Sequence, residues 1–496
     1  MMQKYIQINP VDNVAVAIEN MAAEETLFIG EKKIVLREDI PAGHKIALQD
    51  FKPGEHVIKY GAPIGHAREA ILSGYWVNEK NTKTNLEGLQ DYSFDPQPVP
   101  ALEAKEKMTF KGYKRKNGEV GIRNEIWIIP TVGCVNGIAK QLAEILQQET
   151  KGKNIDAIVP LIHNYGCSQL GDDHENTRKI LRDAVLHPNA GAVLVVGLGC
   201  ENNQIGAFRE FLGDFDEERI RFMETQKVDD EIETGIGLLR ELYVLASQDV
   251  RTEVPIGELR IGLKCGGSDG FSGITANPLL GVFSDFLVAQ GGSTVLTEVP
   301  EMFGAETILM NRAASKDIFD KTVHLINDFK SYFMENKQPI YENPSPGNKA
   351  GGISTLEEKS LGCTQKAGTS AVQDVLLYGE RLEKKGLNLL SAPGNDLVAS
   401  TALAASGCHM VLFTTGRGTP FGTFVPTVKV STNSNLYIRK PNWIDFNAGS
   451  LLEGDTMEKL HQRFVAYLID VASGTLTNNE KSNYREIAIF KTGVTL

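Results

Sequence analysis

Residues 190–200 read Ala-Gly-Ala-Val-Leu-Val-Val-Gly-Leu-Gly-Cys, and this stretch decides the fold class. Residues 192–196 are continuously apolar, without the alternation of a half-exposed strand, which is typical of a strand covered by helices on both faces. The glycines after it predict a turn, and residues 204–212 predict a helix. A strand, a tight turn and a helix in succession predict an α/β fold with a mainly parallel sheet.

The same pattern extends in both directions along the chain. Upstream, strands are predicted at 125–130 and 155–162, and helices at 138–148 and 173–186. A polar stretch at 247–258 separates this block from a second succession, in which strands are predicted at 259–263, 293–297, 387–390, 410–414 and 425–430. We therefore predict two α/β domains, a middle one at 108–250 and a C-terminal one at 251–496.

The first 90 residues have a different character. Short β-like runs at 31–37 and 55–60 alternate with Pro-Gly turn signals, and one helix is predicted near Val14. This predicts a small, mainly β domain at 1–90. Residues 91–100 then contain three prolines, which disfavour a helix and a central strand, so 91–107 is predicted to be an extended linker.

Composition excludes several classes of protein. The chain has 496 residues, 42% hydrophobic and 23% charged, which is typical of a folded protein with several domains. Its net charge of −12 provides no overall field that attracts nucleic acid or anionic lipid, so neither is a predicted partner. The start lacks a secretory signal and no run approaches ~20 apolar residues, which predicts a cytoplasmic protein without a membrane span.

Three Gly-Cys steps recur at a spacing of 33 residues, each just after a predicted strand: Gly133-Cys134, Gly166-Cys167 and Gly199-Cys200. The spacing resembles that of a βαβ unit rather than a solenoid repeat, because the segments share little else. Ligands bind beyond the carboxyl ends of strands in open parallel sheets. The repeats could therefore bring three thiols to one rim, although the strand order is undetermined at this stage.

Several of these loops carry metal-ligating side chains. His163 and Cys167 lie four residues apart at a strand end, Cys200 is followed by Glu201, and Glu298 follows another strand. Ferrous iron accepts imidazole, carboxylate and thiolate, so the candidate metal ligands are Cys167, Cys200, Glu201 and Glu298. The spacing matches neither a structural zinc site nor a ferredoxin cluster, and the alternative is a helix-capping loop with a buried cysteine. Two neighbouring carboxylates are interpreted as solvated helix charges, those of Glu301 and Glu306.

Three cationic side chains lie in loops that could bind an anionic substrate. Lys264 opens a Gly-rich loop that also contains Ser268 and Asp269, and such a loop can surround an anion with backbone N–H groups. Arg417 lies between two glycines, where its guanidinium could bind a carboxylate at two points, and Lys366 lies in another predicted turn. Tight turns and solvated loop cations are the alternatives.

A nucleotide is not predicted as a cofactor. Gly197 and Gly199 begin a dinucleotide-like pattern, but Asn202 replaces its third glycine. No P-loop or HExxH motif is present.

Longer blocks of sequence resemble the altronate/galactarate dehydratase family over nearly the whole chain. The blocks that carry the resemblance are 130–136, 164–173, 197–203, 264–277, 298–306, 341–352, 358–366, 393–396 and 413–420. The resemblance implies a β-clip (SAF-like) N-terminal domain, a middle domain that contributes to dimerisation, and a Rossmann-like C-terminal domain, and hence a homodimer. One segment departs from the family: residues 77–81 read Val-Asn-Glu-Lys-Asn where relatives often have Val-His-x-His-Asn, so we assign that segment no role in the site.

The resemblance also implies an activity: loss of water from D-altronate to give 2-dehydro-3-deoxy-D-gluconate in hexuronate breakdown, with a divalent metal, Fe²⁺ or alternatively Mn²⁺. Removing the C2 proton builds negative charge, which a metal and cations must stabilise. Lys264, Lys366 and Arg417 are the candidates for charge stabilisation, and His409 followed by His163 for the general acid or base, although either imidazole could instead bind metal. The candidate substrate-binding residues are Ser268, Asp269, Asn395 and Asp396.

Three alternatives to this function remain open. Within the same class, the substrate could be galactarate or another sugar acid, because the shape of the pocket cannot be read from the sequence. From other classes, the chain could be a nicotinamide-dependent dehydrogenase or a non-catalytic acid-binding protein.

Overall fold

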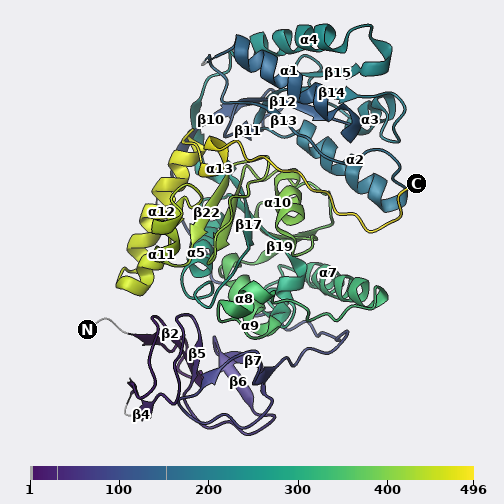
Figure 1. Ribbon diagram of the computed structural model, residues 1–496. Helices are drawn as coiled ribbons and strands as arrows, with labels where there is room; N and C mark the ends of the chain where they lie inside the picture. Colours follow the sequence, from purple (N-terminus) through teal and green to yellow (C-terminus); the bar gives the residue numbers. More distant parts are fainter. Residues whose placement is uncertain (1–3, 31, 105, 152) are drawn as a thin grey trace.

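The computed structural model describes residues 4–30, 32–104, 106–151 and 153–496, and it arranges them in three units (Figure 1). The N-terminal unit consists of short antiparallel strands in three small sheets. Their bounds are β1 Tyr5–Ile6, β2 Val14–Ala17, β5 Lys45–Ala47 and β8 Trp76–Val77; β3 Thr26–Ile29 and β4 Lys32–Val35; and β6 His56–Lys59, β7 Ala62–Ala67 and β9 Thr82–Lys83. The described part of this unit contains no helix.

The helix predicted near Val14 is wrong. Residues Val14–Ala17 form strand β2, which pairs with β1 and β5, and all four of its side chains are buried. The reason is that alternate residues of β2 pack into two different apolar clusters, one containing Val14 and the other Ala15. A strand can bury both of its faces in this way, whereas a short amphipathic helix could not.

Residues 84–104 and 106–108, which include most of the predicted linker, contain neither helix nor strand. The segment lies against the C-terminal unit. The Tyr92 hydroxyl bonds the Glu306 carboxylate and accepts from Lys330 Nζ at 3.0 Å, and Gln97 N donates to Asn311 O at 2.8 Å.

The middle unit is a parallel sheet with helices on both faces. Its strands lie in the order β13 (Ile158–Pro160), β12 (Glu125–Pro130), β14 (Ala190–Gly197), β15 (Ile220–Glu224). Helices α1 (Asn136–Glu149) and α4 (Glu231–Ala246) cover one face, and α2 (Gly171–Val185) and α3 (Ile205–Leu212) cover the other. The α/β fold and parallel sheet predicted from the apolar stretch are confirmed.

A small antiparallel sheet adjoins the middle unit. It contains β11 (Val120–Gly121), β10 (Thr109–Lys114) and β16 (Thr252–Pro255). Strand β16 lies in the polar stretch interpreted as a separator, and it pairs with β10 across more than 130 residues of chain.

The C-terminal unit is a seven-stranded parallel sheet. Its order is β19 (Val372–Leu376), β20 (Gly386–Leu390), β18 (Ser293–Leu296), β17 (Arg260–Cys265), β21 (Met410–Thr415), β22 (Thr427–Ser431), β23 (Phe446–Asn447). The chain enters at the centre with β17, continues to one side, and returns to the other side with β21. The carboxyl ends around β17 are therefore at the topological switch point, where ligands bind in Rossmann-like sheets.

Nine α-helices belong to this unit: α5 Ala276–Ala289, α6 Glu306–Met310, α7 Lys316–Glu335, α8 Pro346–Ala350, α9 Leu356–Thr364, α10 Asp396–Ala405, α11 Ser434–Arg439, α12 Met457–Ala472 and α13 Asn478–Lys481. Helix α10 packs on α2, so one apolar cluster continues from the C-terminal sheet into the middle unit. Helices α8 and α9 face the N-terminal unit (Figure 1). Among the described residues, no helix has the length and apolar character to cross a membrane. The predicted domain boundaries at residues 90, 107 and 250 stay predictions.

Candidate active site

A buried cluster of thiol and charged side chains lies at the carboxyl ends of β17 and β18. Lys264 and Cys265 are the last two residues of β17, and Glu298 and Glu301 follow β18 in and beside the 3₁₀ helix η4 (Val299–Met302). Helix α9 and the following 3₁₀ helix η5 (Gln365–Ala367) complete the cluster with Lys359, Cys363 and Lys366. Each of these seven residues is at most 6% exposed.

Two thiols and one carboxylate form the centre of this cluster. The Sγ atoms of Cys265 and Cys363 are 3.2 Å apart, and Glu301 Oε2 lies 3.1 Å from the first and 3.2 Å from the second. The three ligand atoms all lie within 4.8 Å of one another. Thiolate and carboxylate are ligands for borderline-soft divalent ions, so this triad could hold a metal.

Two buried lysines flank the triad. Lys366 Nζ donates to Cys265 Sγ at 2.9 Å, and Lys359 Nζ lies 2.6 Å from Glu301 Oε1. Burial acts to lower the pKa of both lysines, but the charges of Glu301 and the two sulfurs outweigh it and raise the pKa of each above its ordinary value. Both ammonium groups therefore remain charged in the protein interior.

The two carboxylates of the cluster titrate in opposite directions. Burial, reinforced by the charge of Glu301, raises the pKa of Glu298 to about 8. For Glu301, burial acts in the same sense, but Lys359 and Lys366 overcome it and lower the pKa to about 2. Two neighbouring acids with such different pKa values can divide the roles of proton carrier and permanent anion.

Glu298 is held in a strained position between a cation and a backbone amide. It has a left-handed backbone with φ of 68°, which is rare for a non-glycine residue and is often found at functional sites. Its Oε2 accepts from Cys265 N at 2.8 Å, and its Oε1 lies 3.0 Å from Lys264 Nζ. Lys264 also donates to Asp396 Oδ1 at 2.8 Å, and the side chain of Asp396 is 35% exposed. The cluster therefore reaches solvent on the Asp396 side.

The two thiols also differ in ionisation. The hydrogen bond from Cys363 and the neighbouring lysine charges lower the pKa of Cys265 to about 6, whereas the pKa of Cys363 is raised well above its ordinary value. One thiolate thus accepts the S–H of the other. A thiolate at neutral pH is the form of cysteine that binds metal.

Comparison with known proteins identifies one family along nearly the whole chain. Three family models match in succession: the altronate/galactarate dehydratase SAF domain at residues 3–85, the D-galactarate dehydratase/altronate hydrolase second domain at 112–247, and the D-galactarate/altronate dehydratase C-terminal domain at 256–495. The chain is 60% identical to the altronate dehydratase of Bacillus subtilis (strain 168), over the full length of both. The chain belongs to the galactarate/altronate dehydratase family.

Two further family members are similar over almost the whole chain. The altronate dehydratase of Escherichia coli (strain K12) is 57% identical over 99% of this chain and 100% of its own length. The galactarate dehydratase (L-threo-forming) of the same organism is 34% identical over 95% of this chain and 93% of its own length. The predicted family and the SAF-type N-terminal domain followed by α/β units are confirmed.

Three of the predicted site residues lie in the buried cluster, namely Lys264, Lys366 and Glu298, and Asp396 contacts the cluster through Lys264. Ser268 lies close by, since its carbonyl accepts from Asn348 Nδ2 at 2.9 Å and Asn348 also contacts Lys359. Asp269 has a structural position instead: its carboxylate accepts from Thr432 Oγ1 at 2.8 Å and from Phe271 N and Ser272 Oγ in its own loop.

Arg417 and Asn395 are at the surface. Arg417 Nη1 donates to Gly347 O at 2.9 Å, which leaves the rest of the guanidinium exposed next to the loop that follows β17. Asn395 is the N-cap of α10, and its side chain accepts from Leu397 N and Val398 N. Its amide oxygen is therefore engaged in capping rather than available to a substrate.

The two histidines predicted as acid or base are not in the cluster. His409 precedes β21, at the opposite, amino-terminal edge of the sheet, where it is fully buried and its Nδ1 accepts from Arg260 N at 3.0 Å. His163 lies in the middle unit, where it donates to Pro130 O at 2.7 Å and accepts from Tyr165 N. Burial lowers the pKa of both, to about 4 for His163, so both are neutral structural groups and we withdraw them as acid/base candidates.

The four predicted metal ligands are divided between two units. Cys167, Cys200 and Glu201 lie in the middle unit, whereas Glu298 is in the C-terminal unit. Glu201 is engaged in its own loop, because its carboxylate accepts from Thr131 Oγ1, Leu198 N and Gly199 N. The four predicted ligands therefore do not form one site.

The sequence interpretation also missed Cys265, Glu301, Lys359 and Cys363, which form the centre of the cluster. The interpretation of Glu301 and Glu306 as solvated charges is wrong, because both are only 3% exposed, and Glu306 pairs with Lys330 at 3.0 Å. The available signal was proximity in sequence, since Cys265 directly follows Lys264 and Cys363 lies three positions before Lys366.

The N-terminal unit packs on the helix that carries Lys359 and Cys363. Glu358 of α9 lies 2.8 Å from Lys45 Nζ and 2.8 Å from Lys59 Nζ, and all three side chains are buried. The two lysines outweigh the effect of burial and lower the pKa of Glu358 to about 2. Breaking a buried ion pair on one side leaves an uncompensated charge, so this triad fixes the docking of the N-terminal unit on α9.

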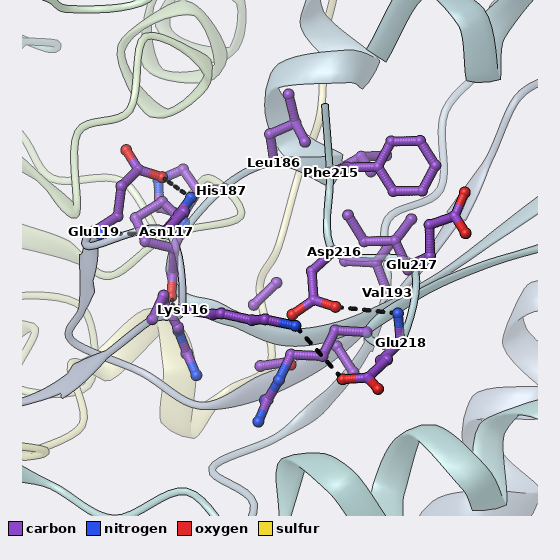
Figure 2. A pocket seen from close by; sticks show the side chains of 18 of the residues that line it. Lys116, Asn117, Glu119, Leu186, His187, Val193, Phe215, Asp216, Glu217 and Glu218 are labelled. Atoms are coloured by element: carbon purple, nitrogen blue, oxygen red, sulfur yellow. Dashed lines mark hydrogen bonds and ion pairs between the residues drawn. The ribbon is translucent and has the colours of Figure 1, made fainter. Parts of the chain in front are cut away.

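One cavity of the described structure lies away from the cluster. It has a volume of about 760 Å³ and lies in the middle unit between the β10–β11 hairpin and the 214–220 loop (Figure 2). Its charged side chains pair with one another, for example Lys116 Nζ with Glu218 at 3.8 Å. A smaller cavity of about 540 Å³ adjoins the cluster, because Asn343 and Gly394 line it and both lie next to the Glu301 carboxylate.

Proposed function

We propose that this protein is a hydro-lyase that converts D-altronate to 2-dehydro-3-deoxy-D-gluconate and water in hexuronate (galacturonate) catabolism. One observation carries the substrate: the chain is 57–60% identical to two altronate dehydratases over their full length, but 34% identical to a galactarate dehydratase. Galactarate is the second candidate substrate.

We propose that Cys265, Glu301 and Cys363 hold a divalent cation, Fe²⁺ or alternatively Mn²⁺. The donor set fits ferrous iron, because two soft sulfurs and a carboxylate converge within 4.8 Å and the low pKa of Glu301 together with the lowered pKa of Cys265 gives two anionic ligands at neutral pH. When bound, the ion supplies Lewis acidity toward a substrate oxygen.

The cations of the cluster would stabilise the charge that develops on the substrate. Loss of the C2 proton gives an enediolate, and the buried ammonium groups of Lys264 and Lys366 are fixed in position before the reaction begins. Arg417, at the surface of the adjoining loop, would bind the substrate carboxylate in two-point fashion.

Glu298 replaces the histidines as the proton-transfer group. As a carboxylate it can accept the C2 proton, and its raised pKa of about 8 then allows it to give that proton to the C3 hydroxyl as that group leaves as water. The enol that remains then tautomerises to the 2-keto acid. Lys264, 3.0 Å away, would stabilise the carboxylate that forms.

The test is an anaerobic assay of the full chain with Fe²⁺ against D-altronate, galactarate and D-mannonate. We expect the highest kcat/KM on D-altronate and loss of activity after chelation of the metal. Activity on galactarate or D-mannonate without activity on D-altronate would overturn the substrate, and full activity of rigorously demetallated protein would overturn the metal.

Two other classes of function predict different results in the same preparation. A nicotinamide-dependent dehydrogenase would bind NAD(H) saturably in a titration followed by cofactor fluorescence. A non-catalytic acid-binding protein would bind D-altronate but leave it unchanged in the presence of reduced iron.

We also propose that the protein acts as a homodimer in the cytoplasm. The middle domain contributes to dimerisation in the family that the sequence resembles. Three exposed cysteines, Cys134, Cys167 and Cys200, suit a reducing compartment, where thiols persist. Light scattering of the purified chain tests the dimer, and a mass equal to one chain at assay concentrations contradicts it.

A further inference from the structure

Three exposed thiols of the middle unit are not used by the proposed reaction. Cys134, Cys167 and Cys200 are exposed, whereas the remaining three cysteines of the chain are buried in the C-terminal unit. Cysteine is among the most frequently buried residue types, so three exposed thiols in one small unit call for a physical explanation.

The strand order now shows that the three thiols lie on one rim. Strands β12, β13 and β14 are adjacent and parallel, in the order β13-β12-β14, and each is followed by one of the Gly-Cys steps. The carboxyl ends of parallel strands share one edge of the sheet, which is where such sheets bind ligands. Figure 1 shows these three strands side by side between the helix layers.

Hydrogen bonds join the first of the three loops directly to the second. Gly133 N donates to Tyr165 O at 3.0 Å. Gly133 directly precedes Cys134, and Tyr165 lies two positions before Cys167. The approach is close: a Cβ atom at Gly166 would lie 2.0 Å from Thr131 O, so only glycine fits there, and its φ is +98°.

The third loop is bonded to the other two. Asn203 N donates to Gly166 O at 3.2 Å, and Asn202 Oδ1 accepts from Ser168 N at 2.8 Å, so the residues on both sides of Cys167 are tied to the loop of Cys200. Glu201 connects the third loop to the first through Thr131 Oγ1 at 2.7 Å. The three Gly-Cys steps are therefore fixed relative to one another by contacts among all three loops.

The spacing of the thiols restricts what they can bind. Among the described residues, the only group of three or more metal-ligating side chains with ligand atoms within 4.8 Å of one another is that of Cys265, Glu301 and Cys363. The three rim thiols are therefore too far apart to surround one small ion together. An inorganic cluster of several iron and sulfide ions is wider than one ion and is bound by separate cysteine thiolates.

We propose that Cys134, Cys167 and Cys200 bind an iron–sulfur cluster at the rim of the middle sheet. Each thiol loses its proton to solvent and coordinates one iron of the cluster through its sulfur. Three thiolates leave one iron of a four-iron cluster without a protein sulfur, and the exposure of the rim leaves that iron accessible. This site is separate from the proposed site of catalysis, and it does not depend on the proposed substrate.

The experiment is anaerobic reconstitution of the full chain with iron salt, sulfide and dithiothreitol, followed by desalting. Iron, acid-labile sulfide and the visible charge-transfer absorption are measured, and activity is not needed as a readout. We expect about four iron and four sulfide ions per chain. Cys134→Ser, Cys167→Ser and Cys200→Ser should each lower bound sulfide and absorption several-fold.

Two control variants distinguish this site from the proposed catalytic one. Cys408→Ala, at a buried cysteine of the C-terminal unit, and Cys363→Ser, in the catalytic cluster, should both retain bound sulfide and absorption. Because the three rim cysteines are exposed, their serine variants should fold, which circular dichroism checks. The proposal is overturned if the reconstituted wild-type chain binds no sulfide, if it binds only zinc or iron without sulfide, or if Cys363→Ser removes the cluster while the rim variants keep it.

Discussion

The Sγ atom of Cys265 lies 3.2 Å from the Sγ atom of Cys363, although the two residues are 98 positions apart in the chain. Cys265 is the last residue of β17, the central strand of the C-terminal sheet, and Cys363 lies on α9, the helix on which the N-terminal unit packs. The candidate active site therefore depends on how the N-terminal unit packs on the C-terminal unit.

Cys363→Ser should weaken metal binding by at least roughly 10-fold, because a hydroxyl is a poor substitute for a thiolate ligand. Mutation of a residue that only supports a metal ligand already lowers metal affinity by roughly 10-fold or more. Dehydration at limiting Fe²⁺ should fall in parallel and recover partly at high Fe²⁺. Metal titration of the variant, with Cys408→Ala as the control, provides the measurement. Equal metal affinities in wild type and Cys363→Ser would remove this residue from the ligand set.

Lys366→Met should lower kcat by roughly 10²–10³-fold, the usual cost of removing one group that stabilises developing anionic charge. The matched control is Lys330→Met: Lys330 is equally buried and pairs with Glu306 at 3.0 Å, outside the cluster. Both variants should lose stability because each leaves a buried carboxylate or thiolate uncompensated. Steady-state kinetics of both, with thermal unfolding, test the assignment; a similar loss of kcat in the two would indicate a purely structural role for Lys366.

Arg417→Ala should raise KM for the sugar acid by roughly 10-fold with a smaller change in kcat, since an exposed guanidinium that binds the carboxylate contributes about 1.5–3 kcal/mol through a charge-assisted hydrogen bond. Arg417→Lys should recover only part of the loss, because an ammonium cannot bind a carboxylate at two points. Arg439→Ala, at an exposed arginine at the end of α11, is the control. An unchanged KM in Arg417→Ala contradicts the role.

The α/β units could be predicted from the sequence because a short continuous apolar run is typical of a strand in a parallel sheet that is buried on both faces. The apolar run around Val193 becomes β14 (Ala190–Gly197), because a strand with both faces apolar must be covered by helices. The helix expected near Val14 failed for a related reason: four residues are too few to show a period, and the two clusters that bury them come from distant strands.

The site was predicted only in part, because its chemistry depends on contacts that no local pattern contains. Lys264 and Lys366 were identified from their loops, but the pairing of Lys366 with Cys265 joins residues 101 positions apart. Glu301 looks like a solvated helix charge in sequence, and only the approach of Lys359 from α9 makes its burial possible. His409 follows a Gly-Cys step, but it lies before its strand, at the edge of the sheet away from the cluster.

The buried triad of Glu358, Lys45 and Lys59 predicts how the protein responds to acid. Because the pKa of Glu358 is lowered to about 2 from its ordinary value of 4.5, the folded state holds fewer protons than the unfolded state between these values. The stabilisation is therefore fully present above about pH 4.5 and is lost as the pH falls toward 2; a shift of this size corresponds to about 3 kcal/mol. For Lys59, the charge of Glu358 outweighs burial and raises the pKa, so this lysine stays charged throughout that range.

Glu358→Gln should accordingly destabilise the protein at pH 7 by about 3–5 kcal/mol, because it leaves two buried ammonium groups without their anion. The free energy of unfolding of the variant should then depend less on pH between 4.5 and 2 than that of the wild type. Urea unfolding across this range gives both quantities, and Glu342→Gln, at an exposed carboxylate, should leave them unchanged. If Glu358→Gln keeps the wild-type acid dependence, the charge of Glu358 does not hold the N-terminal unit on α9.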